Sequence, residues 1–318
     1  MKVFVIGCGR WGSLITWYLD SIGHDVTLYG RRGSKNMERF LAERRNDLLS
    51  LPESVGLTTN IADIRDSETV IISIASQGLR GLFGELAELN VENKNFVLCM
   101  KGIEIGSCKR LSEIAEELLL PSNAVSVWLG PGHVQEFYAG IPNCMVIDGK
   151  SEAIKRRLVD EFSSELIRFY YGTDLIGNEI GGASKNVIGI AAGMLDGFGL
   201  STLKGALMSR GTREIGRLIA ALGGNEISAY GLCHLGDYEA TVFSKYSHNR
   251  QFGESVIRGE SFGQLAEGYY TVKALIELSE KHGVELPICR AVYDVLYEGK
   301  PPYETLSGLF ARSLKSEF

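Results

Sequence analysis

The sequence has little of what marks a secreted, metal-binding or membrane protein. Its six cysteines are scattered without a C-x-x-C pair, which in a chain of 318 residues predicts reduced thiols and a cytoplasmic protein. The five histidines lie far apart and lack the spacing of a metal site, so we expect no metal. No apolar run is long enough to span a membrane. We also expect no signal peptide, because Met1-Lys2 leads directly into an apolar β-type run.

An excess of basic residues is also missing. The net charge of −6 argues against nucleic acid or an anionic membrane surface as a partner. The chain has no linker rich in proline or serine, no low-complexity tract and no internal repeat. Its length and its 45% hydrophobic content suit a globular protein of two directly packed domains.

A glycine motif of the form G-x-G-x-x-G follows the first apolar run. Residues 1–6 lead into Gly7, Gly9 and Gly12, and a helical pattern follows over 13–21. Between a strand and a helix, these glycines permit a tight turn, approach of the backbone to a pyrophosphate, and close helix packing. The N–H groups at the start of the helix suit the same anion. The motif predicts a dinucleotide site, and the alternative is a glycine-rich turn that binds nothing.

The second β-type run, 25–29, ends beside two arginines. NAD-selective sites usually place an acidic residue here, to hold the ribose 2′-hydroxyl. This chain has no acid between Tyr29 and Lys35 and offers Arg31 and Arg32, whose guanidinium groups suit a 2′-phosphate. The sequence therefore favours NADPH without excluding NADH. A solvated basic turn is the alternative.

Strand-like and helical segments alternate up to about residue 171, and only helical patterns follow residue 175. This order predicts an α/β fold, with an N-terminal Rossmann-type, doubly wound parallel sheet over 1–177 and an all-helical domain over 178–318. Ligands of such sheets lie at the carboxyl ends of the strands, where the sequence has Ser76, Lys101 and Gly130. The many small residues of 179–197 need a packing or ligand reason and are compatible with a homodimer.

Several motifs together carry a family resemblance. Residues 179–193 (EIGGASKNVIGIAAG), 101–104 (KGIE), 291–299 (AVYDVLYEG) and 266–268 (AEG) occur in one order with Gly236-Asp237, Thr241 and Ser247-His248-Asn249-Arg250. The whole chain resembles the soluble NAD(P)-dependent glycerol-3-phosphate dehydrogenases. The resemblance implies reversible reduction of dihydroxyacetone phosphate by NADPH or NADH, which gives sn-glycerol 3-phosphate for phospholipid synthesis.

The resemblance also implies roles for single residues. Lys185 is expected to donate the proton, with Lys101 as a second cation and with Asp237 and Thr241 orienting Lys185. Hydride reduction of a ketone needs such a donor, and burial and a carboxylate tune a lysine's pKa in opposite directions. A solvated mid-helix lysine is the alternative. The expected cofactor contacts are Gly7, Gly9, Arg10, Trp11, Gly12, Arg31, Arg32, Lys101, Val134 and Glu267. The expected substrate contacts are Lys101, Gly130, Gly132, Lys185, Asp237, Ser247, His248, Asn249 and Arg250.

The chain departs from the family pattern at two substrate positions. Gly132 stands where the family has a serine, and His248 stands where it has a phosphate-binding arginine. These departures favour the rival function of a reductase that acts on another small phosphorylated or carboxylated ketone. A non-catalytic dinucleotide sensor is a second rival, although it would have no reason to keep Lys185, Lys101 and Asp237 together.

Overall fold

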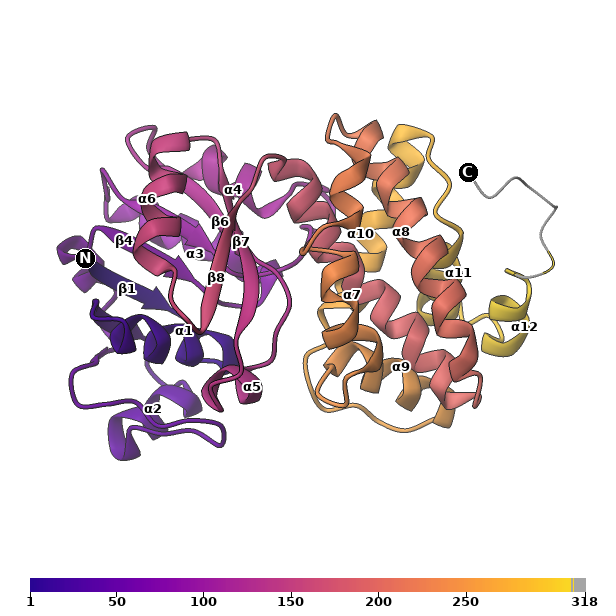
Figure 1. Ribbon diagram of the computed structural model, residues 1–318, viewed down its shortest axis with the longest axis horizontal. Helices are drawn as coiled ribbons and strands as arrows, with labels where there is room; N and C mark the ends of the chain where they lie inside the picture. The colour runs from indigo at the N-terminus through magenta and orange to yellow at the C-terminus, as the bar shows by residue number, and fades with distance from the viewer. Residues whose placement is uncertain (310, 312–318) are drawn as a thin grey trace. The chain divides into compact units, whose positions relative to one another are not determined.

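The computed structural model describes residues 1–309 and 311 and divides into two compact units (Figure 1). The first unit contains Met1–Lys101 and Lys109–Leu175, and the second contains Gly102–Cys108 and the chain from Ile176 onward. Gly102–Cys108 lies far before residue 177 in the sequence. It belongs to the second unit because Ile103 is fully buried in that unit's hydrophobic core.

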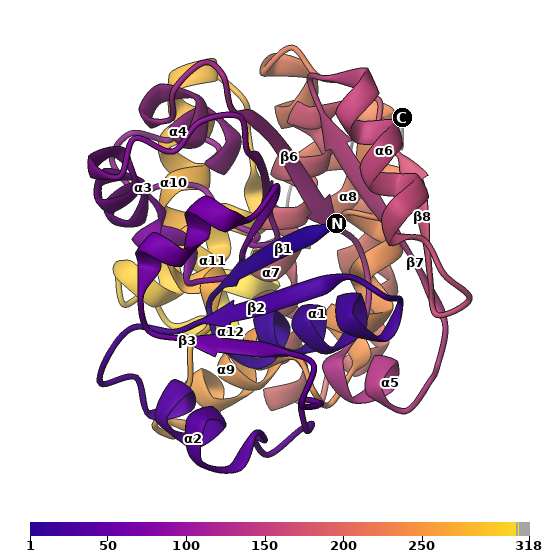
Figure 2. The same cartoon turned by 90° about the vertical axis from the view of Figure 1, so that its left-hand side faces the viewer.

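The first unit is built on one sheet of eight strands in the order β3-β2-β1-β4-β5-β6-β7-β8 (Figures 1 and 2). The strand order reverses at β1, which pairs with both β2 and β4, as in other doubly wound sheets. The strands are β1 (Lys2–Ile6), β2 (Asp25–Tyr29), β3 (Gly56–Thr58), β4 (Thr69–Ile72), β5 (Asn95–Leu98), β6 (Ala124–Leu129), β7 (Asn143–Gly149) and β8 (Ile167–Tyr171).

The sheet departs from the predicted all-parallel arrangement at one pair of strands. β7 runs antiparallel to β6, with Trp128 opposite Ile147, whereas every other pair is parallel. The connection over 130–142 contains only the short helix α5 (Val134–Tyr138). A parallel neighbour requires a full crossover to the opposite end of the sheet, whereas this short connection returns the chain at the same end.

Helices cover the sheet and bury strands whose central residues are apolar. Val5, Ile71 and Val97, from three different strands, have no exposed surface, as expected for strands covered on both faces. Besides α5, the helices of this unit are α1 (Arg10–Ser21), α2 (Lys35–Glu43), α3 (Leu79–Glu88), α4 (Leu111–Leu118) and α6 (Glu152–Phe162).

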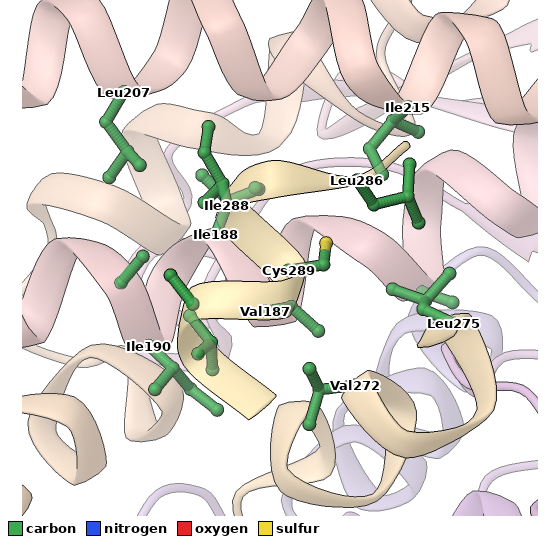
Figure 3. Close-up of a cluster of buried hydrophobic side chains, with 14 of the residues drawn as sticks. Val187, Ile188, Ile190, Leu207, Ile215, Val272, Leu275, Leu286, Ile288 and Cys289 are labelled. Atoms are coloured by element: carbon green, nitrogen blue, oxygen red, sulfur yellow. The ribbon is translucent and has the colours of Figure 1, made fainter. Parts of the chain in front are cut away.

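The second unit is helical and packs around α7. Its helices are α7 (Leu175–Gly197), α8 (Lys204–Ala221), α9 (His248–Arg258), α10 (Glu267–His282), α11 (Pro287–Tyr297) and α12 (Pro302–Ser307). Nearly all of α7 is buried, from Gly177 through Leu195 except Asn178. Figure 3 shows Val187, Ile188 and Ile190 of α7 among side chains of the other helices. A helix with apolar and small residues on nearly all sides is stable only in such a core.

The small residues of α7 have a packing reason. A Cβ atom added to Gly193 would lie 1.9 Å from the carbonyl oxygen of Arg250, at the start of α9. One added to Gly253 would lie 2.1 Å from the carbonyl oxygen of Ile190 in α7. The backbones of α7 and α9 therefore touch, which only glycine permits, and this contact brings the first turn of α9 against α7.

Candidate active site

The glycines of the fingerprint serve different purposes in the first unit. Gly7 has a φ of 116°, and an added Cβ would lie 2.1 Å from the carbonyl oxygen of Ser73. A Cβ on Gly12 would lie 1.8 Å from the carbonyl oxygen of Gly7. A Cβ on Gly9 would meet no atom within 4 Å. Protein packing thus requires the outer two glycines but not Gly9, whose open surface at the start of α1 fits the approach of a pyrophosphate.

Arg10 and Trp11 begin α1 beside α5 of the same unit. The guanidinium of Arg10 donates to the side-chain oxygen of Gln135, with 3.4 Å between Nη2 and Oε1. The ring of Trp11 packs on the ring of Phe137, with centroids 6.0 Å apart. Val134, the first residue of α5, is buried. The glycine turn and α5 therefore lie side by side, and these two elements carry four of the expected cofactor residues: Gly9, Arg10, Trp11 and the buried Val134.

Arg31 and Arg32 lie in the turn between β2 and α2. Both are exposed, and neither forms an ion pair with a residue that the structure describes. The N–H of Ser34 donates to the carbonyl oxygen of Arg31 across 3.0 Å, and the Ser34 hydroxyl caps α2. This geometry presents two exposed positive charges next to the carboxyl end of β2, where the ribose of a dinucleotide lies in doubly wound sheets.

Lys101 and Gly130 follow the neighbouring strands β5 and β6. The Lys101 ammonium donates to the carbonyl oxygen of Gly130, with 2.7 Å between the two atoms. This bond fixes the lysine at the carboxyl edge of the sheet, as its position in the sequence predicted.

Gly132 owes its identity to the backbone and to Phe137. Its φ is 139°, and an added Cβ would lie 2.2 Å from Cε2 of the Phe137 ring. A serine at this position would be strained and would displace the ring. The departure from the family pattern at Gly132 is therefore accompanied by local packing that excludes a side chain.

Lys185 lies at the centre of a buried polar cluster in the second unit. Its Nζ atom is 2.9 Å from Oδ2 of Asp237 and 2.6 Å from the hydroxyl of Thr241. The Thr241 hydroxyl accepts this bond and lies 3.5 Å from the other oxygen of Asp237, to which it donates. Lys185 is 8% exposed, Asp237 0% and Thr241 1%. The alternative of a solvated lysine is therefore wrong, because its charge is paired inside the protein.

An irregular backbone brings Asp237 and Thr241 to this lysine. Asp237 ends a short 3₁₀ turn, Leu235–Asp237, and Thr241 lies in the π-helical turn Glu239–Phe243 that follows at once. Such π turns are rare and are frequent at functional sites, since they re-aim side chains within a helix.

Residues 247–250 form the N-terminal end of a helix. Ser247 caps the N-terminus of α9 by accepting from the N–H of Arg250 across 3.3 Å, and His248 is the first residue of the helix. Serine is a favoured N-cap residue, so the sequence itself favours the start of a helix at this position. The His248 ring lies 3.3 Å from the carbonyl oxygen of Leu265, and Asn249 accepts from the N–H of Gly268 across 2.9 Å.

Arg250 already has anionic partners in the structure. Its Nε atom lies 2.9 Å from Asp196 of α7, and Nη1 lies 3.3 Å from Glu254 of α9. Asp196 also pairs with Lys204 across 2.6 Å. The sequence did not single out Asp196 or Lys204, and an acid and a base eight residues apart carry no motif. The ion pair with Asp196 holds Arg250 against α7.

Glu267 is the first residue of α10, where a carboxylate is favourable for the helix dipole. Gly268, next to it, packs on α7: an added Cβ would lie 2.6 Å from the carbonyl oxygen of Asn186. The first turn of α10 therefore packs against the backbone of Asn186, the residue that follows Lys185. The cofactor contact expected of Glu267 stays a prediction.

The residues that the structure describes offer neither a metal site nor a membrane-spanning helix. No group of three or more potential ligands among histidine, cysteine, aspartate and glutamate is placed to hold a metal ion there. None of the helices within the same residues is both long and apolar enough to cross a membrane.

Comparison with known proteins identifies relatives along the whole chain. The family models described as NAD-dependent glycerol-3-phosphate dehydrogenase N-terminus and C-terminus match residues 2–155 and 174–307. The glycerol-3-phosphate dehydrogenase [NAD(P)+] of Thermoanaerobacter sp. (strain X514) is 36% identical over 331 residues, covering 100% of this chain and 99% of the relative. The same-named protein of Thermotoga sp. (strain RQ2) is 36% identical over 327 residues, covering 100% of this chain and 99% of the relative.

Solved structures of this family share the fold of the chain. Glycerol-3-phosphate dehydrogenase from Coxiella burnetii superposes with a TM-score of 0.91 at 27% identity, covering 98% of this chain and 99% of that one. A 2-dehydropantoate 2-reductase from Methylococcus capsulatus gives a TM-score of 0.63 at 18% identity and covers 99% of each chain, which shows a shared fold alone. With both family models matched in order and full-length relatives at 36% identity, the chain belongs to the NAD(P)-dependent glycerol-3-phosphate dehydrogenase family.

Proposed function

We propose that this protein reduces dihydroxyacetone phosphate to sn-glycerol 3-phosphate and that Lys185 supplies the proton. The observation that carries the assignment is the buried Lys185–Asp237–Thr241 cluster. Membership in the family and the full-length relatives support the substrate and the use of NADH or NADPH. The product is a precursor for phospholipid synthesis.

The lysine cluster suits the chemistry of ketone reduction. NADH or NADPH, when bound, supplies the hydride that reaches C2 of the ketone. Negative charge then develops on the carbonyl oxygen, and a cation at that oxygen stabilises it before donating a proton. The Asp237 carboxylate pairs with the Lys185 ammonium, and the contacts with Asp237 and Thr241 account for two of its three hydrogens. Little freedom of orientation is left to the ammonium group.

The residues present in the first unit fit a dinucleotide. Gly9 offers open backbone at the N-terminus of α1, Arg10 and Trp11 flank it, and Arg31 and Arg32 supply positive charge near the ribose position. We assign cofactor binding to the domain 1–177 and substrate binding to the domain 178–318, with Lys101 contributing to both. Arg31 and Arg32 support NADPH as the preferred cofactor.

The rival function is reduction of another small ketone. Steady-state oxidation of NADPH, followed at 340 nm with dihydroxyacetone phosphate and with a panel of 2-keto acids, tests the assignment. We expect kcat/KM for dihydroxyacetone phosphate to exceed that of every 2-keto acid. A 2-keto acid that is turned over with a higher kcat/KM would replace the proposed substrate.

Two properties of the protein in the cell and in solution are also proposed. All six cysteines are free thiols, which supports a cytoplasmic protein. The second property is a homodimer, which stays a proposal: a cavity of about 750 Å³ in the second unit is lined by both apolar and charged side chains, including Leu207, Val284, Arg213 and Glu214, and does not identify an occupant. Cell fractionation and light scattering coupled to size-exclusion chromatography test these two points.

A further inference from the structure

A fully buried histidine lies beside the lysine cluster. His234 directly precedes the 3₁₀ turn that ends at Asp237, and it has no exposed surface. Its Nδ1 atom lies 2.9 Å from the carbonyl oxygen of Gly181 in α7. Its Nε2 atom lies 2.7 Å from the hydroxyl of Tyr238, which is also fully buried. Neither residue is among the expected catalytic, cofactor or substrate contacts.

The ring of His234 interacts with the backbone of Gly181 and of Gly211 and with the Tyr238 hydroxyl, and the close bond to Gly181 indicates its tautomer. A carbonyl oxygen only accepts, so Nδ1 carries the hydrogen and donates to Gly181. Nε2 is then the acceptor in the neutral ring, and the Tyr238 hydroxyl donates to it. Burial lowers the pKa of His234 to about 4, so the ring stays neutral and both bonds persist at physiological pH.

His234 is hydrogen-bonded to the backbone near each member of the ion pair, through its ring on the Lys185 side and through its own backbone on the Asp237 side. Gly181 lies one helical turn before Lys185, and in an α-helix its carbonyl oxygen also accepts the N–H of Lys185. The carbonyl oxygen of His234 accepts the N–H of Asp237 across 3.0 Å. His234 therefore ties the backbone that carries Lys185 to the backbone that carries Asp237.

Glycines make room for the two rings. A Cβ added to Gly181 would lie 3.0 Å from Cβ of His234, and one added to Gly211 of α8 would lie 3.2 Å from the Tyr238 hydroxyl. The rings of His234 and Tyr238 meet edge to face, with centroids 4.9 Å apart. The pair is thus inserted between α7 and α8 at points where each helix lacks a side chain.

We propose that His234, held by Tyr238, is a positioning residue for proton transfer. Its ring bond to Gly181 and its backbone bond to Asp237 set the separation of the Lys185 ammonium and the Asp237 carboxylate. The proposal rests on the assignment of Lys185 as the proton donor.

Two substitutions at one position separate the hydrogen bond from the volume of the ring. His234→Leu removes the donor. His234→Asn keeps an amide N–H close to the position of Nδ1. A catalytic group displaced by about 1 Å can lose about 10²-fold in rate, so we expect His234→Leu to lower kcat by about 10- to 100-fold. KM for dihydroxyacetone phosphate should change less than about threefold, and His234→Asn should recover most of the lost kcat.

A matched control and a milder variant complete the test. His24→Leu removes another buried histidine bonded to a backbone carbonyl, 3.0 Å from the oxygen of Glu161 in the first unit, and should leave kcat unchanged. Tyr238→Phe keeps the ring volume and removes only the hydroxyl that holds His234, and we expect it to lower kcat about three- to tenfold.

The kcat values of these variants decide whether His234 is a positioning residue. A folded His234→Leu protein with the kcat of the wild type, or no recovery in His234→Asn, overturns it. If His234→Leu does not fold, Tyr238→Phe decides, and an unchanged kcat in that variant overturns it. Lys185→Met in the same assay keeps the two assignments apart. If that variant turns over normally, the proton donor is wrong, whereas its inactivity beside an active His234→Leu protein leaves the donor standing and removes only the positioning role.

Discussion

Replacing Lys185 by methionine removes the ammonium group while keeping most of the side-chain volume. The change leaves the carbonyl oxygen of the substrate without its proton donor. General acid catalysis contributes about 10²- to 10⁴-fold in rate, so we expect kcat to fall by at least about 10²-fold. Binding of NADPH should persist, because the fingerprint glycines and both turn arginines lie in the other unit.

The same substitution has a cost in stability that the structure allows us to estimate. Asp237 has no exposed surface, and its carboxylate lies 2.9 Å from the Lys185 ammonium. Breaking a buried ion pair on one side costs about 3–5 kcal/mol, because the remaining buried charge loses its counter-ion. Removing both charges is far less costly. The double variant Lys185→Met, Asp237→Asn should therefore recover most of the lost stability and none of the lost activity.

Three measurements on the wild type and on the single and double variants test this reasoning. They are kcat from NADPH oxidation, the free energy of unfolding from urea titration followed by circular dichroism, and the dissociation constant of NADPH. A Lys185→Met protein that turns over at close to the wild-type rate would refute the proton-donor role. A double variant that is less stable than Lys185→Met would refute the account of the buried pair, whatever its activity.

Three other predictions concern the cofactor and the phosphate. Arg31→Ala combined with Arg32→Ala should raise KM for NADPH much more than KM for NADH, since only NADPH carries the 2′-phosphate, and equal effects would mean that the two arginines form only a solvated turn. Gly9→Ala should weaken NADPH binding at an unchanged melting temperature. Gly12→Ala should destabilise the fold, because its new Cβ would lie 1.8 Å from the carbonyl oxygen of Gly7. A lower melting temperature for Gly9→Ala would contradict the open space around Gly9. If His248 binds the substrate phosphate only when its ring is charged, KM for dihydroxyacetone phosphate should rise with increasing pH between about 6 and 8, a range around the reference pKa of free histidine. His248→Arg should lower and flatten this profile, and coincident profiles would exclude the contact.

The sequence by itself determined the fold class and the cofactor class. Strand-like runs alternating with helices up to residue 171, and helices alone after it, indicated the two kinds of domain, and local periodicity carries that information. Gly7, Gly9 and Gly12 indicated a dinucleotide because a strand, a turn and a helix follow one another directly in the chain. The pairing of Lys185 with Asp237 was anticipated only through resemblance to a family.

Only the tertiary structure decided the features that depend on contacts distant in sequence. The antiparallel pairing of β6 with β7 depends on the path of the connecting chain, and Gly102–Cys108 joins the second unit through burial of Ile103. Gly193 of α7 is required because the backbone of α9 touches the backbone of α7 at that residue. The sequence did not indicate a role for His234, because a single histidine outside a motif does not reveal which groups it will contact. Its ring bond spans 53 residues, and no periodicity within a segment records which distant carbonyl a buried side chain will meet.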